Sequence, residues 1–183
     1  MNKIGIFFGT DTGTTRLIAK KIAKKLDGMA DKPLNVNRIS LGDMLQYDSL
    51  ILGTPTYGEG QLPGMDTNID AGSWQEFLPQ LEQADLGGKV VALYGLGNQD
   101  KYSESFADSL YYLYEVCVRR GATIVGGWDV TGYNHKASKA EVDGQFVGMV
   151  LDNNNQAIQT DDRIDKWLQL IKPMLAEDIE THA

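Results

Sequence analysis

The sequence predicts an α/β protein: one domain over residues 1–183, built on a doubly wound sheet of five parallel strands in the order 2-1-3-4-5. Strand and helix patterns alternate along the whole chain. The strand patterns are continuous apolar runs, which is typical of parallel strands covered on both faces. The loops richest in glycine, threonine and aromatic residues follow the first, third and fourth strands, whose ends this strand order brings to one edge.

Three strands are predicted in the first half of the chain. The apolar run of residues 4–8 predicts the first, and residues 34–39 predict a short second strand. Residues 49–54 predict the third, which Pro55 closes. Between the first two strands, helical spacing places three apolar side chains on one face of a helix: Ile18, Ile22 and Leu26.

The second half continues the alternation. Apolar residues at helical spacing indicate helices, and glycines stop the patterns between them. The predicted elements are a helix from Ser73, a strand over residues 90–94, a helix over 104–120, strand segments over 122–125 and 146–151, and a helix over 161–175. An insertion over 127–147 interrupts the last strand position.

Charge is distributed unevenly along the chain. The net charge is −8, yet residues 1–40 hold eight Lys/Arg and three Asp/Glu, whereas residues 41–183 hold nine Lys/Arg and 22 Asp/Glu. This asymmetry orients charged partners and argues against nucleic acid, which needs a basic face. The basic residues of the first helix are expected to be its solvated face, with membrane or RNA binding as the less favoured alternative.

Other features limit the compartment and the chemistry. No apolar run approaches the roughly 20 residues that span a membrane. The single cysteine, Cys117, is expected to be a core residue, and a cytoplasmic location is expected because the start of the chain also lacks the shape of a secretory signal. His135 and His182 are isolated, so no metal site is predicted.

The first loop joins a strand to a helix through glycine and hydroxyl residues, Gly9-Thr10-Asp11-Thr12-Gly13-Thr14-Thr15. Free backbone N–H groups and the positive end of the helix dipole make such a turn an anion site. It has neither the lysine of a Walker A motif nor G-x-G-x-x-G spacing, so it suits one phosphomonoester held by neutral donors. The alternative is an ordinary capped helix.

Together with three other segments, this loop resembles flavodoxins, and the chain is similar to the long-chain type. The matching segments are Thr10-x-Thr12-Gly13-x-Thr15, Gly53-Thr54-Pro55-Thr56-Tyr57-Gly58-Glu59-Gly60, Gly95-Leu96-Gly97-Asn98-Gln99 with Tyr102, and Leu151-Asp152 with Asn155-Gln156 and Thr160-Asp161-Asp162-Arg163. The extension over 64–73 is similar to flavodoxins that serve nitrogen fixation. The resemblance covers the whole chain and implies the flavodoxin-like fold.

The resemblance implies FMN as the cofactor. The implied cofactor-binding residues are Thr10, Asp11, Thr12, Gly13, Thr14, Thr15, Thr54, Pro55, Thr56, Tyr57, Gly58, Glu59, Gly60, Leu96, Gly97, Asn98, Gln99, Tyr102 and Asp152. Tyr102 is expected on the outer face of the flavin and Tyr57 on or near the inner face; the alternative is that both are ordinary surface tyrosines. In the family, the peptide after the inner aromatic turns its carbonyl toward the flavin semiquinone, which Gly58 makes easier; the alternative is a simple glycine-rich turn.

Two departures from the family pattern concern charge. Thr14 stands where relatives often have lysine, and Arg16 either compensates or points outward. Asn98 stands where many relatives have Asp, which predicts a slightly less negative low potential. Four carboxylates are expected near the flavin rim, where they lower the potential: Glu59, Asp66, Asp100 and Asp152.

The implied function is a low-potential one-electron carrier that cycles FMN between semiquinone and hydroquinone and is not an enzyme. Expected partners have basic docking surfaces: a ferredoxin/flavodoxin-NADP reductase, a pyruvate oxidoreductase and, as a candidate acceptor, the nitrogenase iron protein. A monomer is expected. The alternative is an NAD(P)H-dependent FMN quinone reductase. A phospho-receiver domain shares the strand order but would have clustered acids where this chain has Gly9-Thr10.

Overall fold

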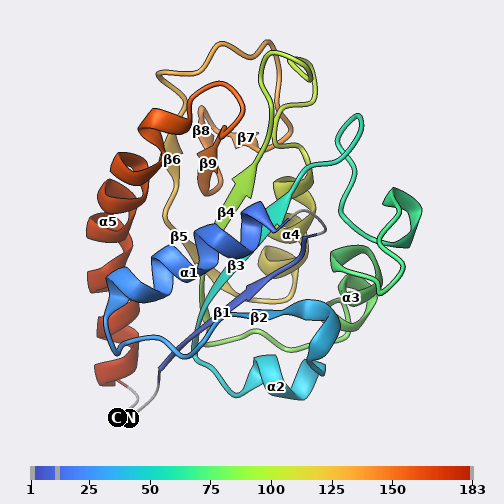
Figure 1. The fold of residues 1–183 in the computed structure, drawn as a ribbon. Coiled ribbons are helices and arrows are strands. Elements are labelled where there is room, and N and C mark those ends of the chain that lie inside the picture. The colour runs from blue at the N-terminus through green and yellow to red at the C-terminus, as the bar shows by residue number, and fades with distance from the viewer. Residues whose placement is uncertain (1–2, 11–12, 182–183) are drawn as a thin grey trace.

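The computed structural model describes residues 3–10 and 13–181. Its main sheet has the order β2-β1-β3-β4-β5 with parallel pairing throughout, as the sequence predicted (Figure 1). The strands are β1 (Ile4–Phe8), β2 (Leu34–Asn35), β3 (Ser49–Pro55), β4 (Val90–Leu96) and β5 (Thr123–Val125).

The last strand position is occupied by two separate segments. One half of β4 pairs with β5, and the other half pairs with β9 (Met149–Leu151). The insertion between them forms a small antiparallel sheet of β6 (Trp128–Asp129), β8 (Gln145–Phe146) and β7 (Glu141–Val142). The predicted strand over 146–151 is therefore wrong as one element, because β8 and β9 belong to different sheets. Between them, a Cβ on Gly148 would lie 2.1 Å from the Leu93 carbonyl oxygen, so the backbone passes very close to β4.

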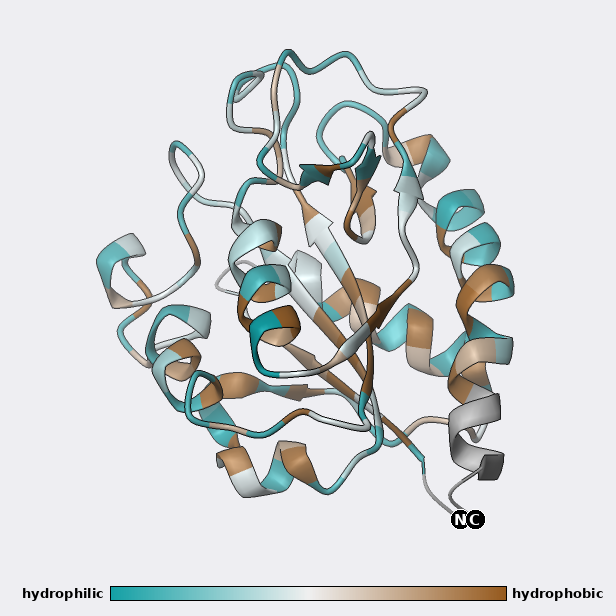
Figure 2. Cartoon of the chain, turned by 180° about the vertical axis from the view of Figure 1, so that it is seen from behind, coloured by the Kyte–Doolittle hydropathy of each residue, from teal (hydrophilic) through white to brown (hydrophobic). Residues whose placement is uncertain are grey.

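Helices cover both faces of the main sheet (Figure 1). On one face α1 (Thr14–Leu26) and α5 (Thr160–Thr181) pack on the strands through a core that includes Ile22 and Trp167. On the other face α2 (Leu41–Leu45), α3 (Trp74–Leu81) and α4 (Ser109–Arg119) share a core that includes Met44, Phe77 and Leu113. Figure 2 shows hydrophobic residues along the central strands and polar residues on the outer sides of the helices. This pattern is what a parallel sheet buried on both faces requires.

Two buried tryptophans fix helices to the sheet through their ring nitrogens. Trp74 at the start of α3 donates to the Gly53 carbonyl at 2.7 Å, and Trp167 of α5 donates to the Gly126 carbonyl at 3.0 Å. Burial of the rings supplies apolar contact, while the hydrogen bonds satisfy the only polar atom of each side chain.

Two further predictions of local structure need correction, and one helix was not predicted. The second strand ends at Asn35, because the Asn35 side chain accepts from the Asn37 N–H at 3.1 Å and starts a 3-10 turn, η1 (Val36–Arg38). The helix predicted over 104–120 begins at Ser109, as α4, which lengthens the loop that follows β4 (the third loop). Helix α2 was not predicted; a capping box between Ser40 and Asp43 stabilises it. Two other 3-10 turns are η2 (Met65–Thr67) and η3 (Ala157–Gln159).

Candidate functional site

A cavity of about 360 Å³ opens where the three glycine- and threonine-rich loops meet at the carboxyl edge of the sheet. This edge is where ligands bind in open α/β sheets. Its lining residues are Thr14, Thr15, Pro55, Thr56, Tyr57, Leu96, Gly97, Asn98, Lys101, Tyr102, Asn153 and Asn154. The loops that the sequence singled out therefore come together around one space.

The first loop offers hydrogen-bond donors to this cavity. Helix α1 begins directly after Gly13, whose φ of 89° is left-handed and whose N–H donates to Thr10 Oγ1 at 3.2 Å. Thr15 is 1% exposed, and its hydroxyl has no hydrogen-bond partner among the described residues. A buried hydroxyl without a partner among these residues, beside a helix N-terminus, fits the binding of an anion such as a phosphate. The predicted contacts of Asp11 and Thr12 lie outside the described residues.

Arg16 does not join this group. Its guanidinium lies 5.6 Å from the centre of the Phe8 ring, and its side chain lines a different cavity. Of the two alternatives for Arg16, the structure therefore favours the outward one. The cation that does line the site is Lys101, whose Nζ lies 5.4 Å from the centre of the Tyr102 ring.

The second loop, which follows β3, is anchored to the start of α4. Ser109 Oγ donates to the Pro55 carbonyl at 2.7 Å and lies 2.8 Å from Thr56 Oγ1. Beyond this anchor, Tyr57 and Gln61 exchange two backbone hydrogen bonds of 3.0 and 2.7 Å and close a tight turn. Gly58 in that turn has a φ of 51°, a conformation that glycine adopts without strain. The anchor presents Tyr57 to the cavity, and Gly58 and Glu59 at the tip of the turn are exposed.

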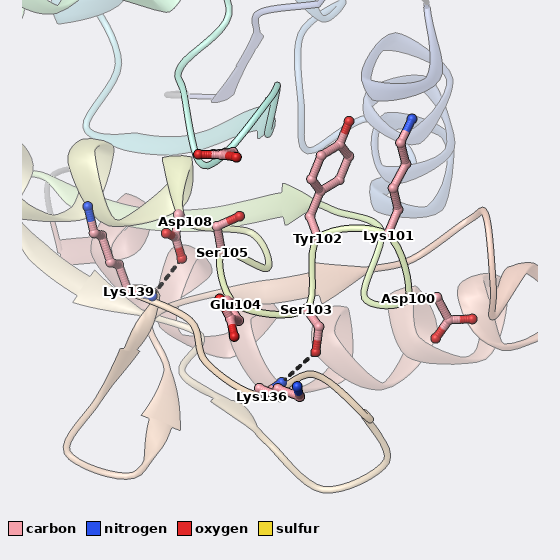
Figure 3. Close-up of a pocket in the computed structure, with 10 residues that line it drawn as sticks. Asp100, Lys101, Tyr102, Ser103, Glu104, Ser105, Asp108, Lys136 and Lys139 are labelled. Atoms are coloured by element: carbon pink, nitrogen blue, oxygen red, sulfur yellow. Dashed lines mark hydrogen bonds between the residues drawn. The ribbon is translucent and has the colours of Figure 1, made fainter.

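The third loop places Tyr102 on the same cavity. The Tyr102 N–H donates to the Asn98 carbonyl at 2.9 Å, and Asn98 Oδ1 accepts from the Lys101 N–H at 3.0 Å and from Asn155 Nδ2 at 2.8 Å. In Figure 3 the side chains of Lys101 and Tyr102 point the same way, on the side of the loop opposite to Ser103. Asn98 thus organises the turn that carries the aromatic ring.

Gln99 and Asp152 lie behind the cavity wall. Asp152 is fully buried, and its Oδ2 accepts from the Gln99 N–H at 3.0 Å while its Oδ1 accepts from the Asn154 N–H at 3.1 Å. The structure therefore gives Asp152 a positioning role that joins the third loop to the segment after β9. Direct contact of either residue with a cofactor stays a prediction.

The insertion packs against the third loop from outside. The N–H groups of Lys136 and Ala137 both donate to the Ser103 carbonyl, and the Phe106 N–H donates to the Ala137 carbonyl. The His135 ring, which contacts Glu141, lies 5.0 Å from the Phe106 ring. These contacts hold the loop that carries Tyr102.

A second cavity of about 550 Å³ lies beside Tyr102, between the second loop, the third loop and the insertion (Figure 3). Glu59, Asp100, Glu104 and Asp108 line it together with three lysines. Burial raises the pKa of the Asp108 carboxyl, and a 2.8 Å hydrogen bond from the Lys139 N–H partly offsets this. Of the carboxylates expected at the rim, Glu59 and Asp100 therefore lie beside Tyr102.

The other predicted positions are near the cavity without lining it. Asp66 lines a neighbouring hollow with Glu59 and Gly60, and Thr54 is buried with its hydroxyl bonded to the Pro55 carbonyl. Sequence reasoning missed Lys101, Asn153 and Asn154. The run of short polar residues directly after an apolar strand was a signal for the two asparagines.

Two searches of the described residues gave no result. No group of three or more His, Cys, Asp or Glu side chains there is placed to hold a metal ion. None of the helices there is long and apolar enough to cross a membrane.

Comparison with known proteins identifies the family. A family model described as flavodoxin matches residues 6–167. A flavodoxin of Enterobacter agglomerans is 49% identical over 174 residues, covering 94% of this chain and 98% of that protein, and one of Klebsiella pneumoniae is 49% identical over 172 residues with the same coverage. The crystal structure of Fusobacterium nucleatum flavodoxin bound to flavin mononucleotide, 37% identical, superposes with a TM-score of 0.86 over 95% of this chain and 99% of that chain. The chain belongs to the flavodoxin family.

Proposed function

We propose that the cavity at the carboxyl edge binds FMN and that this protein is a low-potential one-electron carrier, not an enzyme. Flavodoxins are FMN-containing electron-transfer proteins, and the Fusobacterium nucleatum relative was solved with flavin mononucleotide. The observation that carries the proposal is the buried Thr15 hydroxyl at the start of α1, which has no partner within the described chain and lies on the same cavity as Tyr57 and Tyr102.

The residues that line the cavity fit the parts of FMN. Thr14 and Thr15, with the free N–H groups at the start of α1, would hold the phosphate. Tyr57 and Tyr102 would stack on the flavin, each contact contributing about 0.5–1.5 kcal/mol beyond buried area. When bound, the flavin supplies the one-electron chemistry, and the protein positions it and tunes its potential.

The charges around the site support a carrier that meets basic partners. Glu59 and Asp100 lie beside Tyr102, and residues 41–183 hold 22 Asp/Glu against nine Lys/Arg. A negative field disfavours addition of an electron and attracts basic docking surfaces. The proposed partners are a ferredoxin/flavodoxin-NADP reductase, a pyruvate oxidoreductase and the nitrogenase iron protein. We also propose that the protein acts as a one-domain monomer in the cytoplasm, where its single cysteine stays reduced.

Visible spectroscopy during stepwise reduction tests the proposal. The purified protein is expected to be yellow, to retain FMN at micromolar concentration, and to take up two electrons in separate steps. A colourless protein that does not take up FMN would overturn it.

A second experiment distinguishes an electron carrier from a quinone reductase. NADH added to the FMN-loaded protein is expected to leave the flavin oxidised until a partner reductase is supplied. Rapid bleaching by NADH alone would favour the enzyme.

A further inference from the structure

A cavity of about 240 Å³ lies against the outer side of α1 and shares no lining residue with the candidate FMN cavity. It is formed where the end of β1, the first turns of α1 and the β2–η1 segment meet. Its lining residues are Phe8, Arg16, Lys20, Lys32, Pro33, Leu34, Asn35 and Arg38. Four of these eight are cationic, in a chain whose net charge is −8.

These four cations have no counter-charge among the described residues. Within residues 3–10 and 13–175, none of their side chains makes an ion pair or a hydrogen bond, and the contact of Arg16 is with the Phe8 ring. Arg16 and Lys20 are four residues apart on one helix, so their charges repel each other. An unpaired, like-charged group around a cavity indicates a binding site for an anion.

Two other lysines of the same helix behave differently. Lys21 lies 2.7 Å from Asp161, and Lys25 lies 2.5 Å from Asp165, both on α5. The side of α1 that faces α5 is therefore neutralised within the protein. Lys24 in the last turn of α1 makes no ion pair within residues 3–10 and 13–175 and does not line the cavity, whereas Arg16 and Lys20 both line it.

A buried side chain adds a further donor to the cavity. Asn35 is 7% exposed, and its Oδ1 is already used by the Asn37 N–H at 3.1 Å. Its Nδ2 has no acceptor among the described residues. The polar side chains that line the cavity are thus donors, and no carboxylate belongs to its described lining. Phe8, Pro33 and the 38% exposed Leu34 supply an apolar part.

We propose that this cavity binds the diphosphate group of a small molecule, either free pyrophosphate or the diphosphate of a nucleotide. Several cations around one space match a compact group with more than one negative charge, and guanidinium and ammonium groups are the usual partners of phosphate oxygens. The cavity is smaller than the roughly 300–1,000 Å³ that drug-sized ligands occupy, which suits the diphosphate itself, with any attached ribose or base over the apolar part.

Calorimetric titration of the FMN-loaded protein at fixed ionic strength tests the proposal. Bound FMN keeps the added phosphates out of the flavin cavity, and the absorbance of the flavin shows whether FMN stays bound during the titration. Pyrophosphate and ADP are expected to bind with a Kd of about 1 mM or lower, and inorganic phosphate about tenfold more weakly or worse. Tighter binding of ADP than of pyrophosphate would identify the nucleotide as the ligand; equal binding would identify the diphosphate alone. Failure of both to bind, or inorganic phosphate binding equally well, would overturn the proposal.

A matched pair of double variants separates a built site from diffuse attraction. Arg16→Gln with Lys20→Gln is expected to weaken pyrophosphate binding about tenfold or more. Lys21→Gln with Lys25→Gln removes the same charge from the same helix. This variant is expected to keep the affinity for pyrophosphate within about threefold of the parent, because these side chains do not line the cavity. Equal losses in the two variants would contradict the site. Stronger binding of a Glu-rich peptide than of pyrophosphate would instead make the cavity a protein-docking surface and overturn the proposal.

Discussion

The hydroxyl of Tyr94 on β4 donates a 3.0 Å hydrogen bond to the backbone carbonyl of Thr15 in the first turn of α1. Tyr94 is fully buried, and its ring passes over Gly53 on the strand between them, where a Cβ would lie 2.0 Å from Tyr94 Cζ. Glycine is therefore required at position 53, because a side chain there would prevent Tyr94 of β4 from reaching the first turn of α1. Burial raises the pKa of the Tyr94 hydroxyl, which keeps it a donor.

Tyr94→Phe is expected to lower the free energy of unfolding of the apoprotein by about 1 kcal/mol, because the Thr15 carbonyl loses its donor. Urea denaturation measures the change. Tyr114→Phe on α4 is the control, since no hydrogen bond of the Tyr114 hydroxyl occurs within the described residues and its loss should leave stability nearly unaltered. Equal effects of the two substitutions would show that the Tyr94 bond contributes nothing specific.

Thr15→Val is expected to weaken FMN binding about tenfold to a hundredfold while leaving the apoprotein at least as stable. The hydroxyl has no partner among residues 3–10 and 13–175, so its loss removes no bond seen there, but a charge-assisted bond to phosphate is worth about 1.5–3 kcal/mol. Fluorescence titration with FMN and with riboflavin checks this. Riboflavin lacks the phosphate, so its affinity should not change; a parallel loss for both ligands would contradict the phosphate contact.

Asn98→Asp is expected to make the lower of the two FMN midpoint potentials more negative. The Asn98 oxygen already accepts from the Lys101 N–H and from Asn155, and a carboxylate can keep both bonds while adding one negative charge. Potentiometric titration measures the shift. Gln46→Glu, just after α2 at the opposite edge of the sheet, makes the same change of charge and should shift the potential much less. An upward shift for Asn98→Asp would refute the electrostatic account.

Gly58→Ala is expected to reduce the fraction of one-electron-reduced flavin at the midpoint of a reductive titration. Gly58 has a φ of 51°, and a Cβ there would lie 3.1 Å from Gln61 Oε1, so alanine restricts the turn next to Tyr57. Gly144→Ala, also at positive φ with open space around it, is the control for the conformational penalty alone. An unchanged fraction in Gly58→Ala would count against a mobile turn.

Asp108→Asn is expected to stabilise the protein near pH 7. Burial raises the pKa of Asp108 above its unfolded value, so the charged form of this side chain disfavours folding. The resulting loss of stability develops as pH rises from about 3.8 through the raised pKa. Asparagine keeps an acceptor for the Lys139 N–H. Urea denaturation at pH 7 and near pH 4 should show an advantage that shrinks at the lower pH. A variant less stable than the parent at both pH values would contradict the argument.

Much of the architecture was predictable because it depends on local patterns. Residues 4–8 and 49–54 are continuous apolar runs, and both form central strands with nearly those bounds. The short second strand and the late start of α4 were not predictable, because hydrogen bonds that no periodicity reveals decide them. The Asn35 side chain ends the strand, and contacts of residues 103–108 with the insertion delay the helix.

The sequence by itself determined the alternation of strands and helices, the three loops and the family, since each depends on residue types at fixed spacing. The strand order followed from the rules for parallel sheets and from the resemblance. Only the tertiary structure decided which polar groups are used within the protein and which are left over. It directs Arg16 to a cavity lined by four cations, places Asp152 behind the wall of the candidate FMN cavity, and gives the Thr15 hydroxyl no partner in the part of the chain that is described. The physical reason is that a side chain's partners come from elements distant along the chain, as when β4 supplies Tyr94 to α1.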